Sequence, residues 1–465
     1  MPITLILKSP HDPLSKASLE NFESLDVINE VLFWEEGASL LGIIEKIRTE
    51  FFLIYLPNKG PIKISSENLI NLVLKAKREE AGIVYSDYKI DGRNVRLCDY
   101  KIGSARDDFD FGCLMLFSTQ KVKEVVKKYP KRVNFRFGEL YDLRLKISEN
   151  YPIIHFKYPS YEVPLQKSAF NEETIFSYVD PKNFFYQKEM ESIFTEHLKR
   201  IGAYIPPHLL KSFEDSQDSV SASIVIPVKN REKTIKDALL SAIRQKTDFP
   251  FNIIVVDNHS DDRTKEIISE VGEIYPNIIR IVPERNDLKI GGCWNEAIRS
   301  PFCGRYVIQL DSDDLYSRED TLQMIVDKFR EGKYAMVVGS YMTVDFDLNP
   351  VYPGIVDHRE WSKDNGHNNL LRVSGIGAPR AFERKVLLRI PFRDLDYGED
   401  YDISLRISRN YKIGRIFDVL YLARRWEGGT DHLLNHEKLR QLNEIKDSIR
   451  TEEILGRIDY LRSLS

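Results

Sequence analysis

The chain has 465 residues, enough for two or three domains with their own cores, and a formal net charge of −4. Its charges are mixed, so no basic field indicates a nucleic-acid partner. No apolar run approaches the roughly 20 residues that cross a bilayer. The N-terminus lacks the basic and apolar regions of a signal peptide. We expect a soluble α/β protein of the cytoplasm, with at most a peripheral contact to a membrane.

The cysteines are far apart in the sequence and include no Cys-x-x-Cys pair. They are Cys98, Cys113, Cys293 and Cys303. This spacing predicts reduced thiols rather than a disulfide or a zinc site, because both of those need cysteines brought together in pairs.

Residues 1–165 alternate short apolar runs with amphipathic stretches, which predicts an α/β layer. Strands are expected over 4–8, 51–56, 82–87 and 111–117, helices over 39–48, 66–80 and 119–128, and a further element over 141–150. Residues 166–220 differ, because a helical stretch over 183–201 is followed by Pro206-Pro207 and a polar segment. We interpret 166–220 as a helical linker.

A second α/β unit is predicted over 221–435. Strands are expected over 223–228, 251–256, 278–282 and 306–310, and helices over 232–244, 263–271 and 292–299. This alternation predicts right-handed crossovers, and hence a mostly parallel, Rossmann-like sheet with helices on both faces. Residues 436–465 are predicted to form a charged helix that packs on this second unit.

The predicted strand 306–310 ends in three carboxylates, Asp311, Asp313 and Asp314. The carboxyl end of a buried strand lies on the ligand face of an open α/β sheet. Alternation along an extended chain puts Asp311 and Asp313 on one side and turns Ser312 away. Two adjacent carboxylates suit Mg²⁺ or Mn²⁺, which keep positions for water and phosphate. The alternative is a solvated turn that caps a helix.

Polar residues also follow the two earlier strands of this unit. The loop after the first strand precedes a helix, a place that can hold a nucleotide and its phosphates, although a simple strand–helix turn is the alternative. Asp257 ends the next strand and is placed to accept hydrogen bonds from a base or ribose. The candidates are Pro227, Lys229, Asn230, Arg231, Asp257 and Asn258.

Two further clusters lie downstream. Gly291-Gly292 before a predicted helix permits a ligand to approach the backbone closely, or is simply a helix start. A carboxylate near a cleft can act as general base for a hydroxyl, and paired arginines can clamp phosphate. The residues of these clusters are Asn286, Lys289, Gly291, Asn295, Glu399, Asp400, Arg424 and Arg425.

The two halves of the chain resemble each other. Residues 137–151 align without gaps with 397–411, and 52–59 align with 306–313. In this alignment Pro57, Lys59 and Leu140 correspond to Asp311, Asp313 and Asp400. A lysine repels a cation and a leucine cannot accept a proton. The first half is therefore predicted to be a degenerate, inactive copy retained for packing, acceptor binding or assembly.

The motifs Ile-Pro-Val-Lys-Asn-Arg, Val-Val-Asp-Asn, Leu-Asp-Ser-Asp-Asp and Gly-Glu-Asp-Tyr-Asp occur in this order. Over residues 221–432 they resemble an inverting glycosyltransferase of family 2 with the GT-A fold. The resemblance implies a nucleotide-sugar donor with Pro227, Asn230 and Asp257 around its nucleoside. It places Asp311 and Asp313, which flank Ser312, on the metal- and donor-binding Asp-x-Asp. Asp400, beside Glu399, falls on the catalytic base.

One departure from the family concerns the metal. A histidine ligand often follows a Tyr-Arg pair in the family, whereas Trp426 stands near that position here. His432 is a candidate substitute, and Trp426 could instead stack on a sugar or close over the nucleotide. We expect Mn²⁺ or Mg²⁺, and a UDP-sugar in preference to a GDP- or dTDP-sugar. The expected acceptor is a glycan or a lipid-linked molecule.

The predicted reaction is a single displacement that inverts the anomeric centre, with Asp400 as base. One alternative is a sugar-phosphate nucleotidyltransferase, but its glycine-rich loop after the first strand is absent from 227–231. Another is a non-catalytic sugar-nucleotide or glycan-binding scaffold, against which the carboxylates Asp311, Asp313 and Asp400 argue. The sequence leaves the oligomeric state open.

Overall fold

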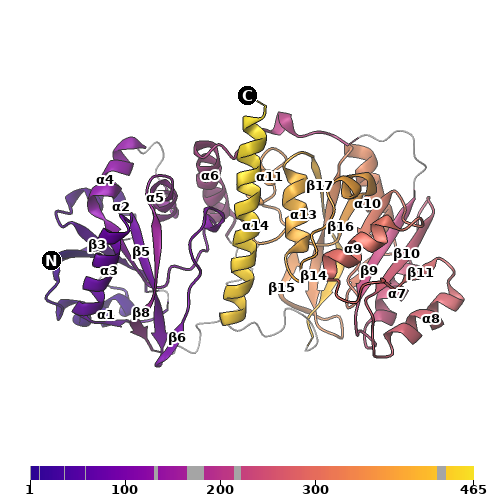
Figure 1. Cartoon of the computed structure of the whole chain (residues 1–465), viewed down its shortest axis with the longest axis horizontal. Coiled ribbons are helices and arrows are strands. Elements are labelled where there is room, and N and C mark those ends of the chain that lie inside the picture. Colours follow the sequence, from indigo (N-terminus) through magenta and orange to yellow (C-terminus); the bar gives the residue numbers. More distant parts are fainter. Residues whose placement is uncertain are drawn as a thin grey trace. The chain divides into compact units, whose positions relative to one another are not determined.

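The computed structural model describes residues 2–9, 11–35, 37–57, 59–129, 135–164, 183–213, 221–426 and 436–464. These residues form two compact units (Figure 1). The first unit holds the described residues within Met1–Thr174, Phe185–Ala203 and Asn435–Ile458. The second holds those within Ile175–Phe184, Tyr204–Leu434 and Asp459–Ser465.

The first unit is an α/β layer. Its strands are β1 (Ile3–Lys8), β2 (Ile28–Trp34), β3 (Phe51–Tyr55), β4 (Lys63–Ile64), β5 (Ile83–Ile90), β6 (Arg93–Val95), β7 (Leu114–Ser118) and β8 (Ile153–Val163). Its helices are α1 (Pro13–Glu23), α2 (Leu40–Lys46), α3 (Ser66–Arg78), α4 (Thr119–Lys128), α5 (Glu139–Ser148) and α6 (Phe184–Arg200). The sheet order is β2-β1-β3-β7-β5-β8-β4, and β6 pairs with β5.

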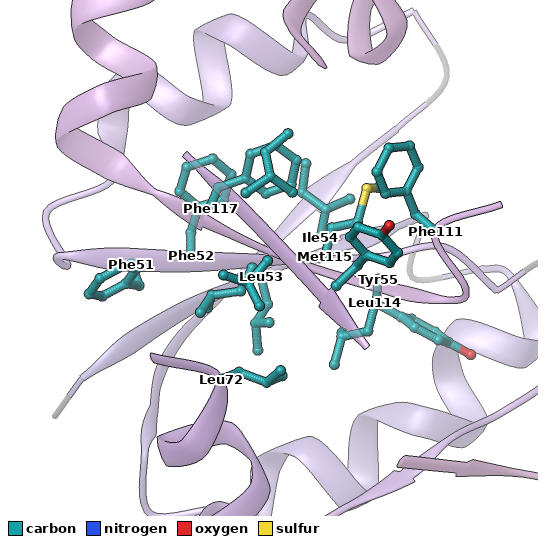
Figure 2. Packing of buried hydrophobic residues seen from close by; sticks show 14 of the residues in the cluster. Phe51, Phe52, Leu53, Ile54, Tyr55, Leu72, Phe111, Leu114, Met115 and Phe117 are labelled. Carbon is teal, nitrogen blue, oxygen red and sulfur yellow. The ribbon is translucent and has the colours of Figure 1, made fainter. Parts of the chain in front are cut away.

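The core of the first unit is built around β3, whose residues are all buried. Phe52 pairs with Phe117 of the antiparallel strand β7, and their rings stack with centroids 5.0 Å apart. Figure 2 shows these two rings on one side of β3 and Leu72 of α3 on the other. Full burial of one such side chain stabilises the folded state by about 1.5–3 kcal/mol. The apolar run of β3 is therefore packed on both faces.

The second unit is also an α/β layer. Its strands are β9 (Ala222–Val228), β10 (Phe251–Asp257), β11 (Ile278–Ile281), β12 (Tyr306–Gln309), β13 (Leu315–Tyr316), β14 (Met336–Val344), β15 (Pro350–Val356), β16 (Arg380–Glu383) and β17 (Ile413–Arg424). Its helices are α7 (Ile235–Ile243), α8 (Thr264–Ile274), α9 (Ile290–Arg299), α10 (Thr321–Gly332), α11 (Gly366–Asn369), α12 (Arg384–Arg389) and α13 (Glu399–Ser408).

The sheet of the second unit has the order β11-β10-β9-β12-β16-β14-β17-β13, with β15 on β14. Strands β11, β10, β9 and β12 are parallel, as predicted, whereas β16 runs antiparallel between β12 and β14. Ile224, Ile226 and Val228 of β9 share a core with α7, α8 and α10. Trp294 of α9 stacks on Phe392 outside that core. The parallel half of the sheet carries the carboxylates that follow β12.

The strands of the two units follow the same spatial order. The first unit has the order β2-β1-β3-β7-β5-β8-β4, and the second has the order β10-β9-β12-β16-β14-β17-β13 after its edge strand β11. Each strand of the first order corresponds to the strand at the same place in the second. Helices α5 and α13 each begin directly after a glycine, Gly138 or Gly398, at the positions that the sequence alignment pairs. The second unit also inserts α8 and β11 between β10 and α9.

The C-terminal helix α14 (His436–Arg462) was expected on the second unit, but up to Ile458 it belongs to the first. Asp447 accepts hydrogen bonds from Arg106 Nε (3.1 Å) and Ser104 Oγ (2.9 Å). A Cβ on Gly103 would lie 2.2 Å from the Asp447 carbonyl oxygen. The prediction is wrong because the buried face of α14 carries charged side chains, which apolar periodicity does not reveal.

Other expectations from the sequence concern the thiols and the membrane. Cys98, Cys113, Cys293 and Cys303 are free thiols, and all of them are buried. Among the described helices, none is both long enough and apolar enough to cross a bilayer. Helix α6 covers nearly all of the predicted stretch 183–201 and belongs to the first unit from Phe185 onward.

Candidate active site

The carboxylates after β12 form a turn at the end of that strand. The Asp314 amide donates to the Asp311 carbonyl oxygen over 3.1 Å. Asp311 and Asp313 are half-buried, whereas Ser312 and Asp314 are buried, so the first pair is the one that a ligand can reach. Helix α10 begins only at Thr321, after β13, so the turn does not cap a helix.

Asp400 reaches the same site through two residues that no sequence motif indicated. Gln309 Nε2 donates to both carboxylate oxygens of Asp311, over 3.0 and 2.8 Å. Its Oε1 accepts a hydrogen bond from the Arg380 amide over 3.2 Å. Arg380 Nη1 lies 2.8 Å from Asp400 Oδ2. Sequence analysis could have found this link from Gln309, because it is a polar residue within the otherwise apolar strand β12.

Several carboxyl groups lie close together in this site. Burial, followed by the charges of Asp313 and Asp400, raises the pKa of Asp311 above its ordinary value, although Arg380 opposes the shift. Burial and the charges of Asp311 and Asp313 hold the pKa of Asp314 well above its usual range. Burial and then Asp400 raise the pKa of Glu399 to about 8. These carboxylates lie close enough to repel one another.

The negative charge of these carboxylates is compatible with a bound divalent cation. Asp311 and Asp313 offer the hard oxygen ligands that Mg²⁺ and Mn²⁺ prefer, and a cation between them would relieve the repulsion. Within the described ranges, no three His, Cys, Asp or Glu side chains are arranged to hold a metal. The proposed metal site therefore consists of this pair, and His432 lies outside the described residues.

Trp426 lies beside the carboxylate pair. Its indole Nε1 donates to Asp313 Oδ2 over 3.2 Å, and its ring centroid is 6.2 Å from that of Phe346 on the loop between β14 and β15. The indole therefore orients a carboxylate of the proposed metal site, a contact that was not foreseen.

The loop after β9 also comes to this site. Arg231 Nε lies 3.9 Å from Asp313 Oδ2. Asn230 has a positive φ of 54°, its amide donates to Ser260 Oγ (3.0 Å), and its Oδ1 accepts from the Asp261 amide (2.9 Å). Asn230 thus joins the loops after β9 and β10. The neighbouring Lys229 is exposed, and Pro227 is half-buried at the end of β9.

Asp257 ends β10 as expected, but its side chain is fully buried. Its Oδ2 accepts from Arg280 Nε (3.0 Å) and its Oδ1 from the Ser260 amide (3.0 Å). Both carboxylate oxygens therefore have partners within the chain. Arg280 of β11, which is a third exposed, connects this position to the surface. Asn258 Nδ2 donates to the Leu288 carbonyl oxygen over 2.8 Å.

A ligand was expected to approach Gly291 closely, but another segment of the chain packs against this glycine. Helix α9 begins at Ile290, so Gly291 lies inside it. A Cβ on Gly291 would lie 1.8 Å from the Arg393 carbonyl oxygen. The Gly292 amide donates to Asp394 Oδ1 over 2.8 Å. The prediction of a ligand contact at Gly291 is wrong, because the backbone of 393–394 fills that space.

The other candidates of this stretch also contact residues within the chain. Lys289 Nζ pairs with Asp396 over 3.1 Å. Asn295 Nδ2 donates to the Phe392 carbonyl oxygen over 2.8 Å, and its Oδ1 accepts from the Phe392 amide over 3.1 Å. Asn286 is exposed, so its predicted contact with the donor stays open.

Arg424 was predicted to clamp phosphate, but its side chain is only 2% exposed. Its amide donates to Asp314 Oδ1 (2.8 Å), its Nε donates to the Asp313 carbonyl oxygen, and its Nη1 donates to Asp237 Oδ2 (3.0 Å). Arg424 braces the carboxylate turn instead, so this prediction is wrong. The Arg425 side chain is half-buried and stays a candidate for the phosphates.

This part of the chain is similar to a known family. Residues 223–390 match the family model described as glycosyl transferase family 2. The chain is 31% identical over 121 residues to the minor teichoic acid biosynthesis protein GgaA of Bacillus subtilis (strain 168), covering 25% of this chain and 26% of GgaA. It is 36% identical over 104 residues to the poly(ribitol-phosphate) beta-glucosyltransferase of Bacillus spizizenii, covering 22% of this chain and 16% of that enzyme.

Among solved structures, one similar chain is S. aureus TarS 1–349 in complex with UDP-GlcNAc. It shares 22% identity with this chain at a TM-score of 0.38, covering 51% of this chain and 72% of that one. The chain thus spans about a quarter or less of the two curated relatives named above.

Proposed function

We propose, from the membership of residues 223–390 in glycosyltransferase family 2, that the protein transfers a sugar from a nucleotide-sugar donor to an acceptor hydroxyl in glycan synthesis. The observation that carries this proposal is the linkage of Asp311 to Asp400 through Gln309 and Arg380. A donor diphosphate beside Asp311 would lie within reach of a base at Asp400. A reaction between donor and acceptor needs both in one site.

The finer proposal is an inverting, metal-dependent displacement. Mn²⁺ or Mg²⁺ on Asp311 and Asp313 would neutralise the charge that grows on the leaving diphosphate. Asp400 takes the proton of the acceptor hydroxyl while that oxygen bonds to the anomeric carbon and the bond to the diphosphate breaks. Glu399, with a pKa of about 8, is mostly protonated at neutral pH and does not compete as the base.

The donor and acceptor are proposed at the level of class. We favour a UDP-sugar over a GDP- or dTDP-sugar, with Arg231 and Arg425 near the phosphates. The names of the two curated relatives support an acceptor in a cell-surface polymer of the teichoic acid type, either a free glycan or a lipid-linked one.

A thermal-shift screen of UDP, GDP and dTDP, each with and without Mn²⁺, tests the donor class. Ligand binding raises apparent stability by mass action, so the correct nucleotide raises the melting temperature only with the metal present. Hydrolysis of the matching nucleotide-sugar then separates an enzyme from a binding scaffold, because a scaffold releases no nucleotide diphosphate. A chain that no nucleotide stabilises would contradict the proposal.

We further propose that the first unit is an inactive copy of the second. The shared strand order and the matching starts of α5 and α13 support this. Lys59, which aligns with Asp313, lies 2.5 Å from Asp110 and 3.1 Å from the Tyr88 hydroxyl. An ammonium group therefore occupies the place where a metal would be expected. Such a unit would serve packing, acceptor binding or assembly.

A further inference from the structure

The active site contains a cation of its own, the guanidinium of Arg380. Its side chain is only 16% exposed, and its Nη1 lies 2.8 Å from Asp400 Oδ2. Burial opposes the positive charge, but the charges of Asp400, Asp311 and Glu399 raise the pKa of Arg380. Arg380 therefore interacts with the proposed base and with the proposed metal ligand simultaneously.

The backbone fixes the position of this guanidinium. In the antiparallel pair of β12 and β16, Ile308 lies opposite Ala381, which places Arg380 next to Gln309. The Arg380 amide donates to Gln309 Oε1 over 3.2 Å, and its Nη1 donates to the Gly377 carbonyl oxygen over 2.8 Å. These contacts hold Arg380 in place without any substrate.

Asp400 is oriented by this arrangement. Its Oδ1 accepts from the Tyr401 amide over 2.7 Å, while its Oδ2 pairs with Arg380. Each oxygen keeps a second lone pair, so the carboxylate can still accept a proton from an acceptor hydroxyl. Without the guanidinium, the Asp400 carboxylate would lose the partner that fixes its Oδ2.

We propose that Arg380 is a positioning residue, which holds the Asp400 carboxylate in its orientation and offsets the negative charge around Asp311. The inference rests on the proposed glycosyl transfer. Loss of Arg380 is expected to affect turnover and cation binding in opposite directions. Loss of Arg380 should impair turnover, because the base is no longer held. The same loss should strengthen cation binding, because a positive charge near the metal carboxylates disappears.

The test compares Arg380→Gln and Arg380→Lys with Arg305→Gln. Arg305 pairs with Glu383 over 2.9 Å at the other end of the same two strands, so Arg305→Gln removes a comparable ion pair away from the site. Three quantities are measured on folded protein: the kcat of nucleotide-sugar hydrolysis or transfer, the Mn²⁺ concentration for half-maximal UDP binding, and the melting temperature.

We expect Arg380→Gln to lower kcat by about 10²-fold, as for loss of a positioned catalytic group. The Mn²⁺ requirement should fall by about two- to tenfold, as the loss of one nearby charge at an intermediate dielectric implies. Arg380→Lys keeps the charge and should recover part of kcat with a near-normal Mn²⁺ requirement. Arg305→Gln should lower the melting temperature and leave the other two quantities unchanged.

Parallel weakening of turnover and Mn²⁺ binding in both Arg380 variants would overturn the inference, because a structural role predicts that pattern. Unchanged turnover in Arg380→Gln would overturn it as well. A wild-type chain with no Mn²⁺-dependent UDP binding and no turnover would instead overturn the proposed function. The two failures are therefore distinguishable.

Discussion

The tips of β3 and β12 occupy the same place in two sheets of the same strand order, yet their charges are opposite. At β3, Lys59 is held 2.5 Å from Asp110. At β12, Asp311 lies near Arg380, and Asp313 lies 3.9 Å from Arg231. The first arrangement is an internally neutral pair, and the second is short of positive charge. A few residues therefore decide the charge at the tip of this strand.

The carboxyl pKa values at the two tips shift in opposite directions. Burial tends to raise the pKa of Asp110, but the charge and hydrogen bond of Lys59, with smaller effects of the Gly112 amide and His436, lower it overall. Burial raises the pKa of Asp311, and neighbouring carboxylates add to that effect. The first unit thus contains a cation of its own beside Asp110, whereas the second unit is proposed to bind one from solution.

The largest expected effect is that of Asp400→Asn. The amide cannot accept the hydroxyl proton, so kcat should fall by about 10³-fold, within the range for loss of a general base. UDP affinity should be nearly unchanged, because Asp400 is proposed to act on the acceptor. The matched control is Leu140→Ala at the aligned position of the first unit, which should leave kcat unaltered. A wild-type rate in Asp400→Asn would show that another residue is the base.

Asp313→Ala should have the next largest effect. It removes one of the two oxygen ligands of the proposed metal, so Mn²⁺-dependent UDP affinity should fall by about 100-fold or more. Calorimetry at fixed Mn²⁺ measures the loss. Asp327→Ala, an exposed carboxylate of α10 outside the site, is the control and should bind UDP normally. Undiminished binding in Asp313→Ala would place the metal elsewhere.

A smaller effect concerns pH. Burial and Asp400 raise the pKa of Glu399 to about 8, far above its unfolded value. The native state therefore keeps a proton that the unfolded chain has lost, and the stability of metal-free protein should decrease as pH rises from about 5 to 8. Thermal melts of Glu399→Gln should show a weaker decrease. A variant with the same pH dependence as the wild type would contradict this assignment.

The smallest effect is expected at the tip of β3. Lys59→Ala leaves Asp110 without its cation, but Asp110 is about two-fifths exposed, so solvent screens the loss. Stability should fall by about 1 kcal/mol, and UDP binding and kcat should not change. Denaturant melts together with turnover assays check both. A decrease of kcat alone would mean that the first unit takes part in the reaction.

The strands that the sequence patterns predicted are present, because burial and alternation are local properties, but β2, β8 and β14 to β17 were not predicted. The structure places β12 within one residue of its predicted end, and α4 matches its prediction. The carboxylates after β12 were also visible in the sequence, but a solvated turn that caps a helix was an equally open interpretation of them.

The side-chain contacts of the site could not be predicted, because they join segments that are far apart in the sequence. Arg380 and Asp400 are 20 residues apart in the numbering, and Gln309 is 71 residues from Arg380. A glycine at position 291 permits close approach of either a ligand or the backbone of Arg393, so the sequence does not distinguish the two. Arg424 could have faced phosphate, but tertiary packing turned it towards the turn after β12. Only the fold decides among such alternatives.

Calorimetric titration of the whole chain with UDP in the presence of Mn²⁺ tests the central claim most directly. We expect one binding site per chain, which persists in Lys59→Ala and is lost in Asp313→Ala. Two sites per chain, or a single site that survives in Asp313→Ala and is lost in Lys59→Ala, would contradict it.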